Sequence, residues 1–519
     1  MACACLLFVW LGGGILGMWA SGRRFRGLGF LAFAVGFGVL GVALLGVAVV
    51  SLPTTYAANA RLGLALCVIL PLWPWYRHRL WRHLYAHGWR RVAMAGAGWY
   101  LLAALALLAT QLPVRLSQPL PDGAYVIKND HLHVRIQAMV GDFPADNYIP
   151  FVAGEFLLRD VQFANERPLM PGQELSNRPI LMSLVYLPFR AFLAAPPRQD
   201  SELPRFQYVG ASWPDVGRFG DDGSFRSFLC VALVLNAALL LGAALLLERA
   251  GIRGTAFGLA LLVLVSNPYY LGQTLFTWPK SLAAFYLLLG GAALLNGHRT
   301  WVVGLLMGMA YWSHPYALAF GLGMAAFLLW RERDDPVIRR GLLPFAVAFS
   351  ASVALWWGWS QWYLQIPTDL VSQNIGSNSA VEAVMVRVIN LRNAFLPWDG
   401  GWSSPDQIAR KSILGLAGAV GVLWLPQAMA GGFLVLRWRP VEVLLLLALP
   451  SACVIGVFGT VTMTGMHGLQ AIGVVLWVLA LWWTRQRVPR AAFFALLWAQ
   501  LVINLAFLAI RASAAADAL

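Results

Sequence analysis

Three acidic residues, Asp130, Asp142 and Asp146, lie in a polar stretch of the chain at residues 122–180. A carboxylate can act as a general base that takes a proton from a hydroxyl group, and it can bind a divalent cation through hard oxygen ligands. Asp146 directly precedes a segment at helical spacing, where an aspartate is also a common N-cap. These residues therefore allow a catalytic, a metal-binding or a structural interpretation.

Side chains that could bind an anion occur at separate places in the sequence. Arg178 lies in the segment Ser176–Pro179, and its guanidinium is suited to binding a phosphate with two hydrogen bonds. Lys280, His314 and His467 each stand at the end of an apolar segment. The structural alternatives are a solvated loop arginine, an interfacial lysine that reaches the membrane surface, and a polar helix cap.

The sequence around these residues is that of an integral membrane protein. Hydrophobic residues make up 59% of the 519 residues and charged residues 12%, with a mean hydropathy of +0.66. Soluble domains carry roughly 25% charged residues. Since a crossing needs about 20 apolar residues, the chain is predicted to be all-α with about fourteen membrane spans. Their centres are near residues 12, 40, 69, 103, 237, 265, 289, 307, 322, 352, 423, 450, 476 and 501.

The positive charges follow a multi-pass pattern. Arginines cluster in short connections at residues 23–26, 77–91, 249–253, 331–340, 437–439 and 485–490. With the predicted spans, all of these connections fall on one side of the membrane, which the positive-inside rule assigns to the cytoplasm. The net charge of +15 is therefore a topology signal and does not predict nucleic-acid binding. The polar stretch, Lys280, His314 and His467 then lie on the non-cytoplasmic side.

The predicted spans divide the chain into five regions. These are a four-span region at 1–113, a first external loop at 114–226, a six-span core at 227–363, a second external loop at 364–412 and a four-span region at 413–519. The first external loop is expected to hold the functional site, because most of the candidate residues lie there. The first four spans carry no candidate chemistry and are interpreted as scaffold.

Two segments of the first external loop are predicted to be interfacial helices. Tyr148–Val161 has apolar and charged residues at helical spacing, and Pro150 suits its first turn. Ile180–Ala195 is apolar but short, and Arg190 interrupts it. If this second segment crossed the membrane, every later arginine cluster would change side, so a helix lying against the membrane fits better.

Several common motifs are missing from the sequence. It has no G-x-S-x-G, H-E-x-x-H, Walker or zinc-finger pattern, and its five cysteines have no metal or disulfide spacing. The G-x-G-x-x-G match at Gly12–Gly17 lies inside an apolar span, so it predicts close packing of helices through small residues and no dinucleotide site.

Four segments together resemble the GT-C superfamily of polytopic glycosyltransferases. GDFPADNYIPFVAGEFLLRD (Gly141–Asp160) resembles the acidic motif with its interfacial helix, and SNRPILMSLVYLPF (Ser176–Phe189) resembles the proline-containing segment that follows. FTWPKSLAAFYLLL (Phe276–Leu289) and WSHPYALAF (Trp312–Phe320) resemble later span entries. The resemblance covers roughly residues 115–330. Asp142 and Asp146 are four positions apart, where many relatives have acidic residues adjacent or one apart.

The resemblance implies an inverting transfer of a monosaccharide from a polyprenyl-phosphate carrier to an acceptor hydroxyl. Asp146, or Asp142 as the alternative, would be the catalytic base, and both could hold a divalent cation such as Mg²⁺ or Mn²⁺. The positions matching the substrate site are Asp130, Arg178, Lys280, His314 and His467. Arg178 and Lys280 would offset charge on the departing phosphate.

The resemblance leaves the acceptor open, and membrane lipids are the expected surroundings. A bacterial inner membrane with an active site on the periplasmic face is the predicted location. Two other functions stay open at this point. A transporter of lipid-linked glycans would have a cationic cavity within the spans. A surface-polysaccharide polymerase or ligase would use external arginine and histidine without an acidic base.

Overall fold

The computed structural model describes most of the chain. The described residues are 2–20, 26–80, 82, 88–109, 149–159, 180–194, 222–332, 336–363, 384–385, 407–458 and 469–516. They form helices joined by turns, and no strand occurs among them. This agrees with the predicted all-α class.

The helices occur in four groups along the chain. The first group is α1 (Ala2–Ala20), α2 (Gly27–Ser51), α3 (Tyr56–Ile69), α4 (Leu72–Arg77) and α6 (Trp89–Ala109). The second is α8 (Ile149–Arg159) and α9 (Leu181–Ala194). The third is α10 (Asp222–Ala237), α11 (Leu239–Arg249), α12 (Thr255–Val265), α13 (Pro268–Leu275), α14 (Lys280–Leu295), α15 (Thr300–Ser313), α16 (Ala317–Glu332), α17 (Pro336–Gly358) and the π-helical η4 (Trp359–Tyr363). The fourth is α20 (Gln407–Trp438), α21 (Pro440–Val443), the π-helical η5 (Leu444–Ala448), α22 (Leu449–Phe458), α23 (Leu469–Arg487) and α24 (Arg490–Ala516).

Each predicted span centre falls within a helix, but not every helix is long enough to cross a membrane alone. Within the described ranges, six helices are long and apolar enough to do so, or seven if the bent pair α12–α13 counts as one span. The fold is thus consistent with a polytopic membrane protein. Helices α14, α15 and α16 have only 16, 14 and 16 residues. Residues 314–316 separate α15 from α16, so His314 lies at the end of a helix, as its place at the end of an apolar segment predicted.

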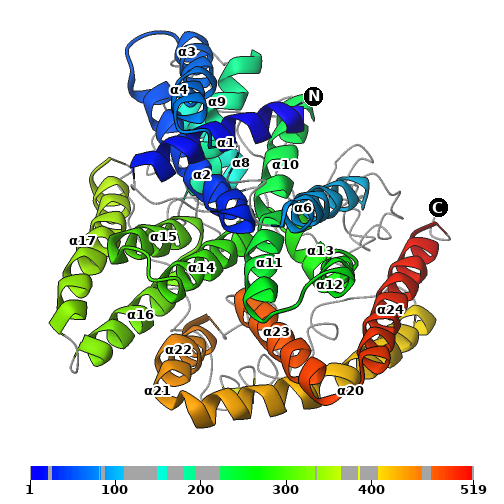
Figure 1. Cartoon of the computed structure of the whole chain (residues 1–519). Coiled ribbons are helices and arrows are strands. Elements are labelled where there is room, and N and C mark those ends of the chain that lie inside the picture. Colours follow the sequence, from blue (N-terminus) through cyan, green and yellow to red (C-terminus); the bar gives the residue numbers. More distant parts are fainter. Residues whose placement is uncertain are drawn as a thin grey trace.

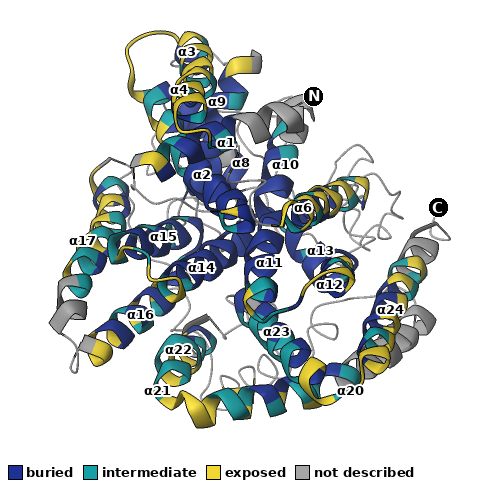
Figure 2. Cartoon of the chain, in the orientation of Figure 1, coloured by how far each residue is buried: buried dark blue, intermediate teal, exposed yellow. Residues whose placement is uncertain are grey.

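The third group of helices forms the centre of the fold. In Figure 1, α10, α11, α14 and α15 lie between the N-terminal helices with α8 and α9 on one side and the C-terminal helices α20, α23 and α24 on the other. Figure 2 shows that the central helices are mostly buried, whereas exposed residues concentrate on the peripheral helices α3, α17, α20 and α24. Apolar peripheral faces are expected where helices meet lipid.

Helices α1 and α2 pack with their backbones in contact, as the sequence predicted for the glycine-rich segment. A Cβ at Gly14 would overlap the backbone of Ala34, and one at Gly38 would overlap the backbone of Trp10. Small residues at such positions allow the close approach on which helix association in membranes depends. The G-x-G-x-x-G match is therefore a packing motif.

Helices α8 and α9 confirm the two helices predicted in the first external loop, but their surroundings differ from the prediction. Pro150 lies in the first turn of α8, as expected. The side chains from Leu181 to Leu187 in α9 are buried, and α9 packs against α2, α3, α8 and α10. A helix lying on a membrane surface would keep one face uncovered, so α9 is a buried helix in which apolar residues meet protein on several sides.

Candidate functional site

The structure describes two of the candidate site residues, Lys280 and His314, and brings them together. The other five, Asp130, Asp142, Asp146, Arg178 and His467, lie outside the described residues. The site is therefore built from the segments around Lys280 and His314 and from the helices that follow Asp146 and Arg178 in the sequence.

The segment before Lys280 turns sharply because helix α13 is bent by 57° from α12. The bend begins at Asn267, whose Oδ1 accepts hydrogen bonds from the backbone N–H of Tyr269 (2.9 Å) and of Tyr270 (3.3 Å). An asparagine N-cap followed by proline at the first helical position is a strong helix start. The chain then leaves α13 at Phe276 and begins α14 at Lys280.

Side chains from other helices hold this turn in place. Asn236 of α10 is fully buried, and its Nδ2 donates to the carbonyl oxygens of Phe276 (2.8 Å) and Thr274 (3.3 Å). Ser281 Oγ donates to the carbonyl oxygen of Gln273 (3.3 Å), and Gln470 Nε2 of α23 donates to Gln273 Oε1 (2.7 Å). The last carbonyls of a helix have no partner within it, and burial makes an external partner necessary.

Lys280 lies in an aromatic cradle at the start of α14. Its side chain is buried, with 5% of the residue exposed, and Nζ is 4.1 Å from the ring centre of Phe276 and 5.2 Å from that of Trp278. A cation over an aromatic face is stabilised by the ring quadrupole, by about 2 kcal/mol or more when desolvated. The two rings thus offset part of the free-energy cost of burying the ammonium group of Lys280.

His314 completes the same cluster from the turn between α15 and α16. Its ring centre is 4.6 Å from that of Trp278 and 4.9 Å from that of Tyr316. The backbone N–H of Tyr316 donates to His314 Nδ1 (3.2 Å). Since Nδ1 accepts a hydrogen bond, the proton of the neutral imidazole is on Nε2. We call Phe276, Trp278, Lys280, His314 and Tyr316 the Lys280 cluster.

The Lys280 cluster can stabilise an anion. Its ammonium group and an imidazole N–H are donors in surroundings made mainly of aromatic rings, where charge interactions are much stronger than in water. A phosphate oxygen is the anion that suits a lysine together with a neutral histidine donor. These two residues are separated widely in the sequence, so only the fold brings their chemistry to one place.

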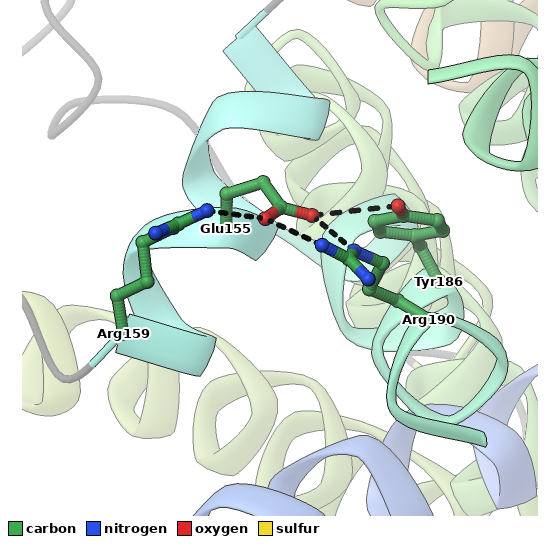
Figure 3. A network of polar contacts seen from close by, with 4 residues as sticks. All are labelled: Glu155, Arg159, Tyr186 and Arg190. Atoms are coloured by element: carbon green, nitrogen blue, oxygen red, sulfur yellow. Dashed lines mark hydrogen bonds and ion pairs between the residues drawn. The ribbon is translucent and has the colours of Figure 1, made fainter. Parts of the chain in front are cut away.

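A second polar cluster joins α8 to α9 and was not predicted from the sequence. Figure 3 shows Glu155 of α8 between Arg190 and Tyr186 of α9 and Arg159 of its own helix. Arg190 contacts both carboxylate oxygens, with Nε at 2.7 Å from Oε1 and Nη2 at 3.4 Å from Oε2. Arg159 Nη2 is 3.7 Å from Oε2, and the Tyr186 hydroxyl is 3.5 Å from Oε1. Glu155 is fully buried.

The sequence carries one signal for this ion pair. Glu155 lies in the predicted helix Tyr148–Val161, and Arg190 interrupts the apolar segment Ile180–Ala195. Opposite charges in two consecutive apolar helices indicate pairing, because a buried charge without a partner is strongly destabilising. The pair fixes α8 on α9, and Ser183 Oγ adds a 2.7 Å hydrogen bond to the carbonyl oxygen of Pro150.

Helix α10 contacts both polar clusters. Near its start, the Phe228 ring packs against Tyr186 at 5.4 Å and Phe151 at 5.7 Å. Farther along, Asn236 supports the turn at Phe276. Eight residues separate Phe228 from Asn236, which corresponds to about 12 Å along a helix. The α8–α9 pair and the Lys280 cluster are therefore neighbours on one helix.

No metal centre is seen among the residues that the structure describes, since no group of three or more His, Cys, Asp and Glu side chains lies together there. The predicted cation ligands, Asp142 and Asp146, fall outside these residues. The divalent cation thus stays a prediction.

The chain has no match among protein-family models, curated proteins or solved structures.

Proposed function

We propose that this chain is a GT-C-type inverting glycosyltransferase that uses a monosaccharide on a polyprenyl-phosphate carrier. The observation that carries the proposal is the meeting of Lys280 and His314 in one buried aromatic cluster. The sequence had offered both residues as candidates for phosphate or substrate binding, with an interfacial lysine and a polar helix cap as the structural alternatives. Random pairs of polar residues rarely share a buried site, because burying polar groups is unfavourable without a purpose or partner.

The proposed reaction is a single displacement. The acceptor oxygen forms a bond to the anomeric carbon of the sugar while the bond from that carbon to the phosphate oxygen breaks. Asp146 takes the acceptor proton, with Asp142 as the alternative base, and the bonding electron pair leaves on the phosphate. Lys280 and Arg178 offset the charge that develops there, and His314 Nε2–H can donate to a phosphate oxygen. Single displacement inverts the anomeric configuration.

The arrangement of α8 and α9 supports this reading. Asp146 precedes α8 by three residues, and Arg178 precedes α9 by three. The first turns of these two helices lie together, because Ser183 bonds to the carbonyl of Pro150. A base before one helix and a phosphate-binding arginine before the other would both act close to the same helix starts.

The helix lengths support a site that is recessed from the outer membrane surface. A helix of 16 residues such as α14 is about 24 Å long, and the 14-residue α15 is about 21 Å long. The hydrocarbon core is about 30 Å thick. In the proposed topology the basic ends of the helices are cytoplasmic, so the Lys280 cluster lies several ångströms below the outer boundary. A carrier lipid can present its phosphate at that depth from within the bilayer.

One cavity among the described helices does not have the cationic lining that the transporter alternative requires. Its lining is almost wholly apolar, and its charged residues, Arg249, Arg439 and Glu442, belong to the helix ends predicted to be cytoplasmic. A path for a phosphorylated glycan would carry polar or cationic groups along its length.

The proposal is tested by sugar transfer with purified protein in lipid, supplied with a panel of polyprenyl-phosphate monosaccharides. Asp146→Asn should abolish transfer while donor binding persists, and Asp200→Asn in the same predicted loop serves as the control. Unchanged transfer by Asp146→Asn would remove its role as the base and move attention to Asp142. An anomeric product of retained configuration would overturn the single displacement.

A further inference from the structure

A cavity of about 680 Å³ lies between α11, α14, α16, α20, α21 and α23, and its lining includes no residue of the Lys280 cluster. In Figure 1, the C-terminal helices α20, α21 and α23 lie below the central helices α11 and α14 and the neighbouring α16. The volume is within the roughly 300–1,000 Å³ range of ligand sites. Leucine, valine, isoleucine and methionine side chains supply most of the wall. Such a wall favours a hydrocarbon ligand over a water-soluble one.

The cavity is one membrane leaflet deep. Along α23 its lining extends from Ala471 to Trp482, and along α14 from Leu287 to Leu295. Eleven residue steps on α23 correspond to about 16 Å at the helical rise. Half of a hydrocarbon core of about 30 Å is about 15 Å. The length of the cavity therefore matches one acyl chain of a single leaflet.

One end of the cavity is positively charged. Arg249, Arg439 and Glu442 line it there, so two guanidinium groups and one carboxylate leave one net positive charge. Arg249 donates to Asn296 Oδ1 (2.6 Å) and the carbonyl oxygen of Leu295 (3.1 Å), which fixes it at the end of α14. Arg439 pairs through Nη1 with Glu442 at 2.8 Å, and its side chain is 66% exposed. A guanidinium has five N–H donors, and the bond from Nη1 of Arg439 to Glu442 uses one of them.

We propose that this cavity binds a membrane phospholipid with an anionic headgroup, its acyl chain in the apolar slot and its phosphate at Arg249 and Arg439. The arginine end is the end that the positive-inside pattern assigns to the cytoplasm, so the lipid comes from the cytoplasmic leaflet. Trp482 at the same end suits the headgroup level, where tryptophan is enriched. This inference concerns a second site, and only the preference for a phospholipid over the polyprenyl carrier rests on the proposed sugar transfer.

A phospholipid fits this site better than the polyprenyl carrier does. The carrier phosphate is proposed to bind at the Lys280 cluster. This cluster lies at the first residue of α14 and just after the last residue of α15, whereas Arg249 lies at the other end of α14. A carrier with its phosphate at Arg439 would place its sugar on the wrong face of the membrane. A resident phospholipid has the chain length and the headgroup depth that the cavity requires.

Filling the slot tests the acyl-chain site. Gly291 of α14 and Gly432 of α20 line the cavity, and a Cβ at either position would meet nothing within 4 Å. Leucine also favours a helix more than glycine does. Delipidated protein carrying both Gly291→Leu and Gly432→Leu should retain phosphatidylglycerol about tenfold less well in native mass spectrometry than wild type. Gly29→Leu in α2, another open position outside the cavity, should bind as wild type. Equal retention by the filled variant and wild type would overturn the site.

The headgroup is tested with an exposed residue, so folding is not at risk. Wild type should prefer phosphatidylglycerol over phosphatidylcholine of the same chains, and Arg439→Gln should lower this preference about tenfold, equivalent to about 1.4 kcal/mol. Arg490→Gln, an exposed arginine outside the cavity, should keep the preference. Equal binding of the two lipids to wild type would overturn the anionic headgroup. Displacement of phosphatidylglycerol by a polyprenyl phosphate at lower concentration would assign the cavity to the carrier instead.

Discussion

The hydroxyl of Tyr316 donates a 2.9 Å hydrogen bond to the backbone carbonyl of Lys280, 36 residues earlier in the chain. This bond connects the turn after α15 to the first residue of α14. Because Tyr316 also positions His314 through its backbone N–H, one residue sets the relation between the two candidate donors.

Tyr316→Phe should therefore weaken donor binding while leaving the fold intact. The loss of one buried hydrogen bond costs about 1 kcal/mol of stability. Tyr286 makes an equivalent bond from its hydroxyl to the carbonyl of Gly36 (2.8 Å), so Tyr286→Phe is a matched control. We expect similar falls in thermal stability for both variants and a raised donor KM for Tyr316→Phe alone. A raised KM in both would show a general effect of destabilisation.

Lys280→Gln should lower the rate of transfer more than it weakens donor binding. A donor aimed at developing charge contributes about 10²–10³ in kcat where it has been removed from other enzymes. Lys280→Arg keeps the charge and the contact with aromatic rings, so it should recover part of the rate. Transfer rates measured with saturating polyprenyl-phosphate sugar separate kcat from KM. Equal rates for wild type and Lys280→Gln would exclude a role for the ammonium group.

Glu155→Gln should strongly destabilise the protein, because two arginines lose the charge that compensates them. Removing one partner of a buried pair costs about 3–5 kcal/mol. Replacing both Glu155 and Arg190 by methionine should restore part of this loss, since Arg190 is removed together with its carboxylate and only Arg159 still loses this contact. Glu442→Gln breaks an ion pair whose arginine is 66% exposed, and should change stability by less than about 1 kcal/mol. The stabilities of these variants are compared by the temperature at which each one aggregates in detergent.

Asn236→Ala should disturb the turn before Lys280 without touching substrate. The carbonyl of Phe276 would lose its partner, at a cost of about 1–3 kcal/mol for a buried unsatisfied group. Asn504 is equally buried and donates to the carbonyl of Val263 (2.9 Å), so Asn504→Ala provides a matched loss elsewhere. Only Asn236→Ala should change donor KM as well as stability. The same KM in both variants would assign Asn236 a purely structural role.

The backbone contact between α1 and α2 predicts a position-specific effect of small substitutions. Gly14→Ala adds a methyl group where the backbone of Ala34 already lies, and should destabilise the protein. Gly29→Ala adds the same group in open space and should be neutral or slightly stabilising through helix propensity. Unfolding temperatures of the two variants in one detergent decide this, and equal values would contradict the contact.

The sequence predicted helices well and their partners poorly, for a physical reason. Hydropathy is a local property, so apolar runs predicted a helix at each of the span centres. Whether a helix meets lipid or protein depends on the whole fold, which is why α9 was expected at the membrane surface and is buried instead.

For the site residues as well, the sequence predicted the residue types but not which residues contact one another. The types of Lys280 and His314 and their places at span ends pointed to a phosphate site. Their meeting depends on a bend of 57° between α12 and α13. Asn267 and Pro268 mark the helix start locally, but the angle of the bend depends on the packing of the whole fold. The pairing of Glu155 with Arg190 joins residues 35 positions apart, so it is indicated only when the two apolar segments are considered together.

The shortness of α14 has an electrical consequence in the proposed topology. Its 16 residues cover about 24 of about 30 Å, so the ammonium group of Lys280 sits roughly a fifth of the way into the hydrocarbon from outside. A charge at that depth experiences about a fifth of the transmembrane voltage, or about 0.5 kcal/mol per 100 mV. An anionic headgroup that moves into the cluster would cross the same fraction of the voltage. The free energy of its binding would therefore depend on the membrane potential.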